Sequence, residues 1–212
     1  MTNDQILLLL TRKQADTDAL ESALAARLPT GARMASILPA DALPGLAHAD
    51  GLAPGLPDVL VTLPASATAE IVAATDGMFN REASALLAFR RHAVLPGSDA
   101  IRLYFGLRRL PHLSLEGFHD YWLNKHADIG RKLIPPYTYH QLHADPAATA
   151  HWAETVGIPA STLDGVVEVH FPDVDAFVRQ LSREDVASEA LADERNFIDH
   201  SRSQFWAYRE RA

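Results

Sequence analysis

The 212-residue sequence contains no cysteine, which excludes disulfide bonds, thiolate metal ligands and a cysteine nucleophile. It also lacks a long apolar run. The segment 6–10 follows Asp4 and is too short for a signal-peptide core or a membrane span, so it is better interpreted as a strand. Basic residues are outnumbered, 19 against 27 acidic ones, and no basic stripe with interleaved aromatics occurs. We therefore expect a cytoplasmic protein that binds neither nucleic acid nor membrane.

Several motifs of enzyme chemistry are also missing. The sequence has no Gly-rich phosphate loop, no G-x-S-x-G nucleophile elbow and no kinase signature. His119 and His126 are seven residues apart, too far for shared ligation from one helix, and His140 and His143 fall on opposite faces of an expected strand. From these spacings we expect no metal site and no bound cofactor.

What the chain does contain is a repeated order of elements. In each half an apolar strand is followed by a helix, two further strands, a second helix and a last strand, the β-α-β-β-α-β order of a ferredoxin-like unit. The matched segments are 6–13 and 101–109, 17–28 and 114–133, 32–41 and 137–146, 58–64 and 164–172, and 85–93 and 203–211. The Pro/Gly/Ser-containing stretch 95–100 is typical of a linker, which divides the chain into 1–96 and 97–212.

A single ferredoxin-like unit leaves one face of its sheet uncovered by helices. Two units in one chain can cover each other. The expected fold class is therefore α+β, with tandem ferredoxin-like (βαββαβ) repeats packed sheet to sheet as an intrachain α+β barrel. Two independent domains that each dimerise with another chain are the open alternative, and we expect a monomer or a homodimer.

The two halves differ in their side chains. All five tyrosines, all three tryptophans and eight of the ten histidines lie in 97–212, so this half is expected to carry a site and 1–96 to act as scaffold or lid. Strand alternation gives the second half an aliphatic face and a face of aromatic rings with polar tips. We expect the second face to line an apolar cavity between the two sheets, against the alternative that it meets solvent. Prominent on it are Tyr104, Tyr139, Glu168, His170, Trp206 and Tyr208.

His126 stands out in the helix expected at 114–133. It falls in the middle of an apolar stripe that includes Phe118, Trp122 and Ile129. A lone histidine there is more often a satisfied core residue, but the tyrosines that follow it and the carboxylate of Glu168 offer partners for proton transfer near neutral pH. His170 is a second candidate, against simple strand packing. The paired arginines that end the strand at 101–109 are expected to be solvated rather than to bind an anion.

The pattern S-x-x-x-F-x-x-Y-W-x-x-x-H, carried by Ser114, Phe118, Tyr121, Trp122 and His126, resembles the EthD family. The similarity runs over roughly 100–207, whereas the first half departs from the pattern and looks like a diverged second copy. The resemblance implies a ferredoxin-like α+β barrel, usually formed by two chains. It also implies metal-free and nucleotide-free chemistry on hydrophobic, often aromatic or polyketide-like molecules, with His126 as acid/base or positioning group. Other members accompany degradation pathways without a clear catalytic role.

We therefore expect a cofactor-independent lyase or isomerase whose partner is a small hydrophobic molecule, changed by cyclisation, dehydration or decarboxylation. The expected catalytic residues are His126, Tyr139, Tyr104 and His170. The expected substrate-binding residues are Trp122, Tyr137, Gln141, His143, Glu168, Trp206 and Tyr208. Two alternatives stay open: a haem enzyme resembling chlorite dismutases and dye-decolourising peroxidases, with His126 as axial ligand, and a non-catalytic binding module for an apolar metabolite.

Overall fold

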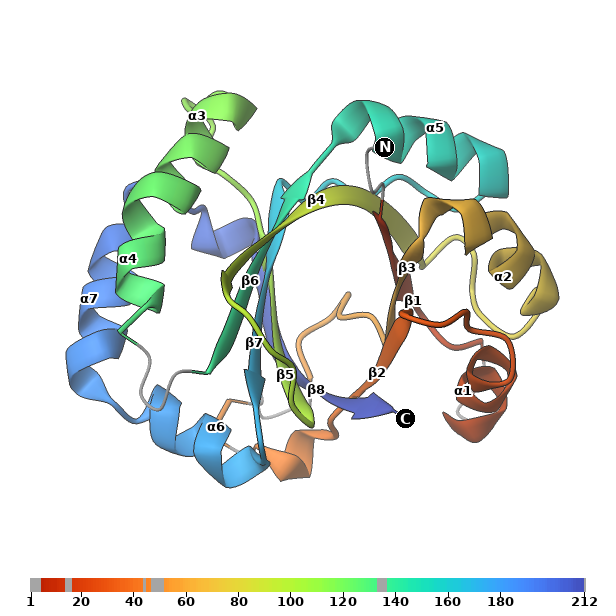
Figure 1. Ribbon diagram of the computed structural model, residues 1–212, viewed down its shortest axis with the longest axis horizontal. Helices are drawn as coiled ribbons and strands as arrows, with labels where there is room; N and C mark the ends of the chain where they lie inside the picture. Colours follow the sequence, from red (N-terminus) through yellow and green to blue (C-terminus); the bar gives the residue numbers. More distant parts are fainter. Residues whose placement is uncertain (1–4, 14–16, 44, 47–51, 133–136, 212) are drawn as a thin grey trace.

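The computed structural model describes residues 5–13, 17–43, 45–46, 52–132 and 137–211. Within this part of the chain eight strands form one closed barrel, with helices on the outside (Figure 1). The strands are β1 (Gln5–Leu10), β2 (Arg33–Ile37), β3 (Val59–Pro64), β4 (Ala85–Leu95), β5 (Ile101–Leu107), β6 (Thr138–Ala144), β7 (Gly165–Phe171) and β8 (Gln204–Arg211). Their order around the barrel is β1-β3-β2-β8-β5-β7-β6-β4.

Each repeat forms its own four-stranded antiparallel sheet. In the first, β1 lies between β3 and β4, and β2 pairs with the other side of β3. In the second, β5 lies between β7 and β8, and β6 pairs with the other side of β7. The pairs β2–β8 and β4–β6 join the two sheets edge to edge and close the barrel. The expected fold class, an intrachain α+β barrel of two ferredoxin-like repeats, is confirmed.

The helices divide between the two sides of the barrel in Figure 1. Helices α1 (Thr17–Ala25), α2 (Thr68–Ala74) and α5 (Pro146–Val156) lie on one side, and α3 (Leu115–Tyr121), α4 (Ala127–Gly130), α6 (Val174–Leu181) and α7 (Glu184–Glu194) on the other. Short helical turns are η1 (Ala40–Ala42), η2 (Ala65–Ala67), η3 (Trp122–His126) and η4 (His200–Arg202). No helix among the described residues is long and apolar enough to cross a membrane.

Helix α5 belongs to the second repeat but packs on the first. Val156 joins the apolar cluster formed by the outer face of the first sheet, and Thr149 accepts a hydrogen bond from the backbone N–H of Ala88 at 3.0 Å. The repeated order of elements predicted no helix here, because it places two strands in succession at 137–146 and 164–172. The helix begins where the Asp145 side chain accepts the backbone N–H of Ala148, and it ends at Gly157, which has a φ of 65°. An insertion in one repeat thus covers the other.

The helix expected at 114–133 is continuous over its described residues but changes type. Ser114 begins it by accepting the backbone N–H of Gly117 at 3.0 Å. The turn at η3, from Trp122 to His126, is a π-helix between α3 and α4. A π turn takes up an extra residue and re-aims the side chains that follow it, which is why such turns occur often at functional sites. Here it sets the direction of His126.

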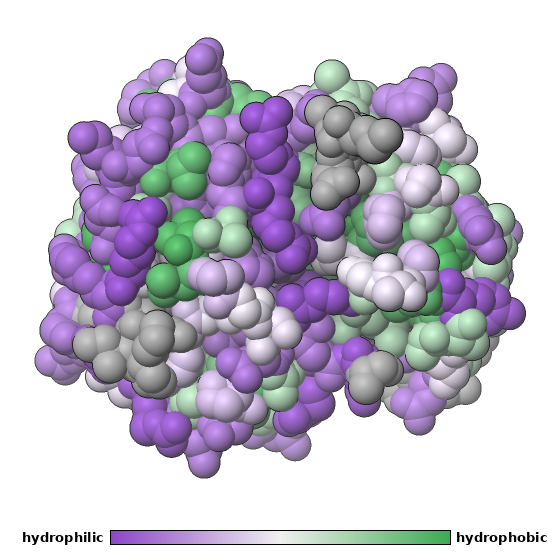
Figure 2. Space-filling model, in the orientation of Figure 1, coloured by the Kyte–Doolittle hydropathy of each residue, from purple (hydrophilic) through white to green (hydrophobic). Residues whose placement is uncertain are grey.

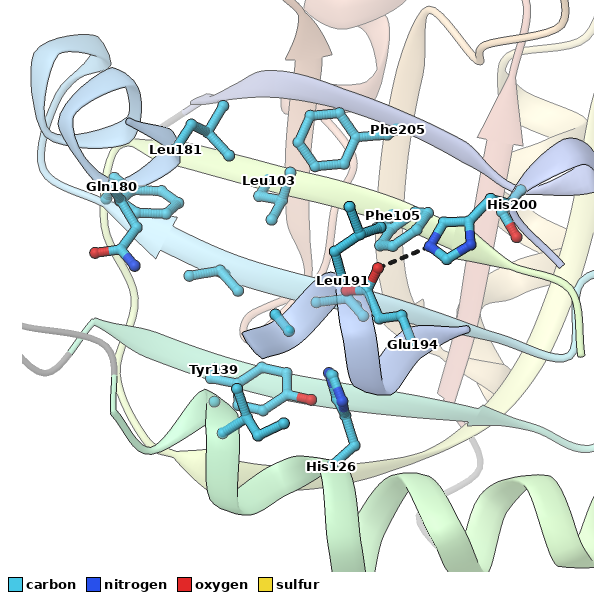
Figure 3. A pocket seen from close by; sticks show the side chains of 17 residues that line it. Leu103, Phe105, His126, Tyr139, Gln180, Leu181, Leu191, Glu194, His200 and Phe205 are labelled. Carbon is cyan, nitrogen blue, oxygen red and sulfur yellow. Dashed lines mark hydrogen bonds and ion pairs between the residues drawn. The ribbon is translucent and has the colours of Figure 1, made fainter. Parts of the chain in front are cut away.

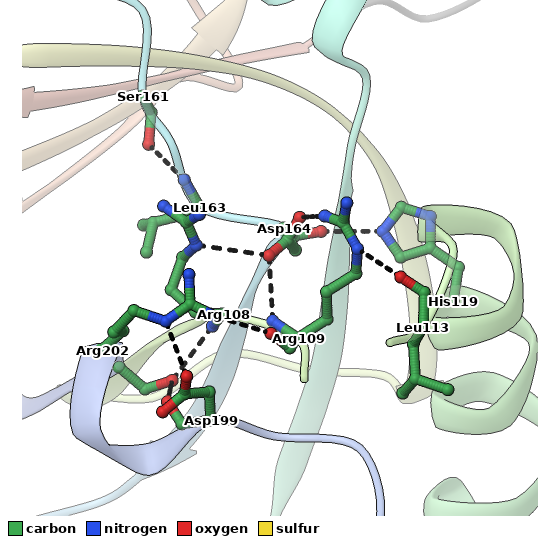
Figure 4. Close-up of polar contacts among 10 residues, drawn as sticks. Arg108, Arg109, Leu113, His119, Ser161, Leu163, Asp164, Asp199 and Arg202 are labelled. Carbon is green, nitrogen blue, oxygen red and sulfur yellow. Dashed lines mark hydrogen bonds and ion pairs between the residues drawn. The ribbon is translucent and has the colours of Figure 1, made fainter. Parts of the chain in front are cut away.

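Polar contacts fix the ends of β5 and β7 below this helix (Figure 4). Asp164 accepts the backbone N–H of Arg109 at 2.9 Å and forms ion pairs with the side chains of Arg108 and Arg109. Its backbone carbonyl contacts Nε2 of His119 on α3 at 2.7 Å. The two arginines, expected to be solvated, are instead ion-paired and hold the strand ends against α3.

The barrel interior differs from the expected apolar chamber. The predicted ring-bearing and polar face of β5, β7 and β8 does point between the two sheets. It places there the fully buried Arg102, whose Nη1 donates to Oε1 of Glu168 at 2.9 Å, and Glu210 pairs with the same guanidinium. The interior differs from the expected apolar cavity in two ways: charged side chains from several strands meet there, and Leu7, Leu87 and Phe89 of the first sheet pack with Tyr104 of the second in one buried apolar cluster.

Candidate functional site

An apolar cavity of about 430 Å³ lies on the opposite face of the second sheet, between that sheet and its helices (Figure 3). Strands β5, β7 and β8 supply its floor with Leu103, Val169 and Phe205, and α7 supplies Leu191. This make-up, an apolar body with a few convergent polar groups, is usual for a site that binds small molecules. The polar members of the lining are His126, Tyr139, Gln180, Glu194, His200 and Ser203.

His126 enters this cavity with one ring nitrogen already engaged. Its Nδ1 lies 2.7 Å from Oδ2 of Asp193 on α7, and Oδ1 of the same carboxylate accepts the hydroxyl of Tyr121 at 2.7 Å. Burial alone would raise the pKa of Asp193, but the hydrogen bonds from Tyr121 and His126 outweigh it and lower that pKa. An ionised carboxylate only accepts, so His126 donates from Nδ1 and keeps Nε2 for a ligand.

Tyr139 lies on the same wall as His126, with its hydroxyl turned to the His126 side (Figure 3). That oxygen accepts hydrogen bonds from Nε1 of Trp122 at 3.1 Å and Nε2 of Gln141 at 2.8 Å. Burial raises the pKa of Tyr139 to about 12, so the phenol stays protonated near neutral pH. With both neighbours donating, its own O–H is left to donate to a bound molecule.

A layer of predicted binding residues supports these two from behind. Gln141 is fully buried. Its Nε2 donates to the hydroxyl of Tyr139, and its Oε1 accepts a hydrogen bond from Nε2 of His143 at 2.9 Å. The ring of His143 stacks between His119 and Trp122, with centroids 4.3 and 4.8 Å away. Burial lowers the pKa of His143 to about 2, so this imidazole is neutral. These residues position the wall rather than line the cavity.

Tyr137 also lies on the helix side of the sheet. Its ring packs on Phe171 with centroids 4.6 Å apart, and Phe171 lines the cavity. Of the predicted site residues, His126 and Tyr139 thus line the cavity, and four others buttress it. These four are Trp122, Tyr137, Gln141 and His143.

The remaining predicted site residues lie on the other face of the sheet. Tyr104 pairs in register with Glu168 and Trp206, whereas Tyr139 pairs with Val169. Directly paired residues share a face, so Tyr104 and Tyr139 point to opposite sides, and the expectation that both line one cavity between the sheets is wrong. The predicted residues inside the barrel are Tyr104, Glu168, His170, Trp206 and Tyr208.

These interior residues have structural partners or a buried environment. Tyr208 donates to the carbonyl of Pro57 at 2.7 Å, and Nε1 of Trp206 donates to the carbonyl of Leu38 at 2.8 Å. Burial and then Arg102 lower the pKa of His170 to about 3. Burial disfavours the ionised form of Glu168, but the nearby positive charge of Arg102 outweighs it and lowers the pKa of that carboxyl.

Three residues of the site were missed by the sequence analysis: Asp193, Glu194 and His200. Glu194 and His200 line the cavity, and Nε2 of His200 lies 2.8 Å from Oε2 of Glu194 (Figure 3). The acidic stretch that starts at Asp193 is visible in the sequence, but 67 residues separate it from His126. No local spacing links the two residues, and only the packing of α7 on the π turn brings them together.

The fold and this cavity define a single-chain α+β barrel whose second repeat carries a pocket with a histidine–carboxylate pair. Residues 110–201 match the family model of the EthD domain, the family that the Ser114-to-His126 pattern resembles. No sequence among the curated proteins matches the chain.

Solved structures support the fold over its whole length. One is a proposed chlorite dismutase, TA0507, with a TM-score of 0.53 and 13% identity, covering 99% of this chain and 95% of that one. Another is a proposed monooxygenase from Fusobacterium nucleatum subsp. nucleatum, with a TM-score of 0.52 and 9% identity, covering 99% and 94%. At these identities the likeness shows the architecture, a barrel made from two similar halves.

The haem alternative raised by the sequence, with His126 as axial ligand, can be tested against the lining of the cavity. His126 has the carboxylate partner that an axial histidine commonly has. Haem, however, brings two propionate carboxylates that need cations or water where they leave the pocket. None of the described lining residues is a lysine or an arginine, and Glu194 adds a negative charge. The lining therefore does not fit haem.

Proposed function

We propose that this protein is a cytoplasmic, cofactor-independent enzyme of the lyase or isomerase type. It transfers a proton on a small hydrophobic molecule, aromatic or polyketide-like, in a cyclisation, dehydration or decarboxylation reaction. The observation that carries the proposal is His126, whose Nδ1 is held by Asp193 while its ring lines an apolar cavity. An imidazole whose Nδ1 is held by a carboxylate, in a mainly apolar cavity, is suited to be a general base.

The roles of the polar groups follow from their contacts. Nε2 of His126 takes a proton from an acidic C–H or O–H of the substrate. Tyr139 donates its hydroxyl hydrogen to the oxygen on which charge develops, since Trp122 and Gln141 already donate to that hydroxyl. His200, paired with Glu194 on the same cavity, returns a proton at another position. Two proton-exchanging groups on one cavity suit isomerisation and elimination.

The substrate class follows from the rest of the lining. Leu103, Phe105 and Phe205 offer flat apolar surface, and the only described carboxylate of the lining, Glu194, is paired with His200. Such walls favour a compact, uncharged ring system that carries a carbonyl or phenol group. A non-catalytic carrier would use the same walls, so the experiment must separate binding from proton transfer.

Proton transfer is measurable before the natural product is known. The protein is incubated in D2O with a panel of aromatic ketones, phenols and quinones, and deuterium uptake at carbon is followed by mass spectrometry and NMR. We expect uptake for those panel members that bind, and a fall of about 10²–10⁴-fold in the rate for His126→Gln. His151→Gln changes an exposed histidine on α5 and should leave the rate unchanged.

The outcomes separate the two functions. Saturable binding without deuterium uptake or product, across the panel, identifies a carrier and contradicts the enzyme proposal. Uptake that His126→Gln leaves intact would show that another group moves the proton. Binding is measured for each variant by isothermal titration, so that a lost rate is not confused with a lost ligand.

A further inference from the structure

We propose that the barrel interior holds a binding site for one divalent transition-metal ion, formed by His140, Glu168 and His170. The site lies on the opposite face of the sheet from the cavity and does not depend on the proposed function. Histidine spacings within a single helix or strand do not reveal this set of three residues. It arises because two neighbouring strands, β6 and β7, each contribute side chains to the interior.

The strand register places the three residues together. His140 on β6 pairs directly with Glu168 on β7, and His170 follows Glu168 by two residues, so all three side chains share one face. One nitrogen from each imidazole and one carboxylate oxygen all lie within 4.8 Å of one another. In a tetrahedral site two ligands at about 2.1 Å from the ion are about 3.4 Å apart, so the longest of these separations must shorten by up to about 1.4 Å when an ion binds.

The free atoms of these residues point to a missing ligand. All three residues are at least 96% buried, with exposed fractions of 4%, 1% and 0% for His140, Glu168 and His170. Nevertheless Nδ1 of His140, Oε2 of Glu168 and Nε2 of His170 have no hydrogen-bond partner among the described residues. The nearest approach, Nδ1 of His140 to Oε2 of Glu168, is 3.7 Å. Buried polar atoms are seldom left unpaired, and a shared ion would satisfy all three.

Three arginines oppose a cation here and set its affinity. Arg102 forms ion pairs with Oε1 of Glu168 and with Glu210. Neither pair uses Oε2 of Glu168, which stays available to an ion. Arg91 is the direct competitor, since its Nη2 lies 3.7 Å from Oε2 of Glu168. Nη2 of Arg33 lies 3.2 Å from Nδ1 of His170; because a guanidinium only donates, this Nδ1 accepts and the ring proton is on Nε2, so Arg33 must move away before Nε2 can bind an ion. Arg91 and Arg33 have side chains 24% and 21% exposed, so each can swing toward solvent.

The donor set selects the ion. Two imidazole nitrogens and one carboxylate oxygen suit zinc, cobalt or nickel, whereas magnesium and calcium prefer oxygen ligands alone. Three protein ligands leave the remaining positions to water. We therefore expect Co²⁺ and Zn²⁺ to compete for one position per chain, and Mg²⁺ not to displace them.

The test titrates chelator-treated, full-length protein with Co²⁺ alone and follows its visible absorption, with isothermal titration for stoichiometry. We expect one Co²⁺ per chain, displaced by Zn²⁺. His140→Gln and His170→Gln should each raise the dissociation constant by about tenfold or more, since even outer-shell changes cost that much. The matched control is His151→Gln, which removes an exposed histidine and should leave binding unchanged. Circular dichroism checks the fold of each variant.

Arg91→Gln provides a test that does not rely on loss of binding. Removing the cation that faces Oε2 of Glu168 should tighten Co²⁺ binding by about tenfold, because a like charge close to the ion opposes it. The same variant would weaken an anion site. Binding of inorganic phosphate that Arg91→Gln weakens, without Co²⁺ binding, would overturn the proposal. So would Co²⁺ binding that is absent in both the unaltered protein and Arg91→Gln, or that persists unchanged in both histidine variants.

Discussion

His126 and Asp193 meet at 2.7 Å across the interface between the π turn η3 and helix α7. The carboxylate serves two donors at once, because its other oxygen accepts the hydroxyl of Tyr121 at 2.7 Å. Its orientation is therefore fixed from both sides. A carboxylate held in this way fixes the tautomer of the imidazole and leaves Nε2 basic.

Asp193→Asn should reverse the tautomer of His126. Tyr121 needs an oxygen acceptor, so the amide would turn its oxygen to Tyr121 and its NH2 group to Nδ1 of His126. The imidazole would then carry its proton on Nε2 and lose its function as a base. We expect nitrogen NMR of His126 to show this change, and the deuterium-uptake rate to fall by up to the factor of about 10²–10⁴ that is expected for His126→Gln.

The double variant Tyr121→Phe/Asp193→Asn is the control for that argument. Without the phenol the amide can rotate and offer its oxygen to His126, so the original tautomer and part of the rate should return. If Asp193→Asn keeps the proton on Nδ1, the carboxylate does not set the tautomer.

Adding haem to the protein should give no Soret band beyond that of free haem. The cavity offers an imidazole, but none of its described lining residues is a cation that could meet the propionates. The measurement is a spectral titration of the unaltered protein and of His126→Gln. A shifted Soret band that disappears in His126→Gln would contradict the expectation and support a haem enzyme.

Much of the architecture could be predicted because it depends on local sequence patterns, namely the spacing of apolar residues within each strand and helix. Alternation and proline stops located the strands, and the repeated order of elements gave the barrel. Helix α5 was missed although Asp145, Pro146 and Gly157 are good start and stop signals, because no equivalent exists in the first repeat. A repeat comparison identifies the elements that both halves share, and helix α5 occurs in one half alone.

The site was only half predictable for a different reason. Alternation correctly divided the strands of the second half into an aliphatic face, which includes Leu103 and packs against helices, and a ring-bearing face. It could not relate the faces of neighbouring strands, which depend on register, and so it grouped Tyr139 with Tyr104. Asp193 depends on tertiary packing alone. Sequence patterns therefore found the histidine and not the group that orients it.

Gly130→Ala should disturb the wall of the cavity. A Cβ at this position would lie 2.2 Å from Cε1 of Tyr139, so the ring or α4 must move. We expect a loss of about 1–3 kcal/mol in the free energy of unfolding, typical of overpacking, with weaker ligand binding. Urea titration measures the first effect. Gly45→Ala is the control, since no atom lies within 4 Å of its Cβ position. If the ring is the obstacle, Gly130→Ala should cost little further stability when it is added to Tyr139→Leu.

Acid should destabilise the protein through His143. Its pKa is about 2 in the fold, against an ordinary value near 6.5, so between these values the unfolded chain binds the proton and the folded chain does not. The contribution to stability is complete above about pH 6.5 and is lost as the pH falls. From pH 6.5 to 5 the loss from this one group is about 2 kcal/mol.

Urea unfolding at pH 7.5 and at pH 5 measures this dependence. His143→Phe keeps a ring between His119 and Trp122 but cannot titrate, so the difference between the two pH values should shrink by about 2 kcal/mol. The variant is also expected to be less stable at both pH values, because Gln141 loses its partner. An unchanged difference would show that His143 is protonated in the fold.

Tyr139→Phe and Tyr104→Phe should have opposite effects on stability, although each removes one buried hydroxyl. The hydroxyl of Tyr139 accepts from Trp122 and Gln141, so its loss leaves two buried donors unpaired at a cost of about 1–3 kcal/mol each. The hydroxyl of Tyr104 is fully buried without a hydrogen-bond partner among the described residues. Removing it relieves an unsatisfied group, so Tyr104→Phe should be neutral or stabilising. Urea midpoints of the two variants check this. If Tyr104→Phe is as destabilised as Tyr139→Phe, the hydroxyl of Tyr104 has a hydrogen-bond partner, such as an ordered water, and the expectation is wrong.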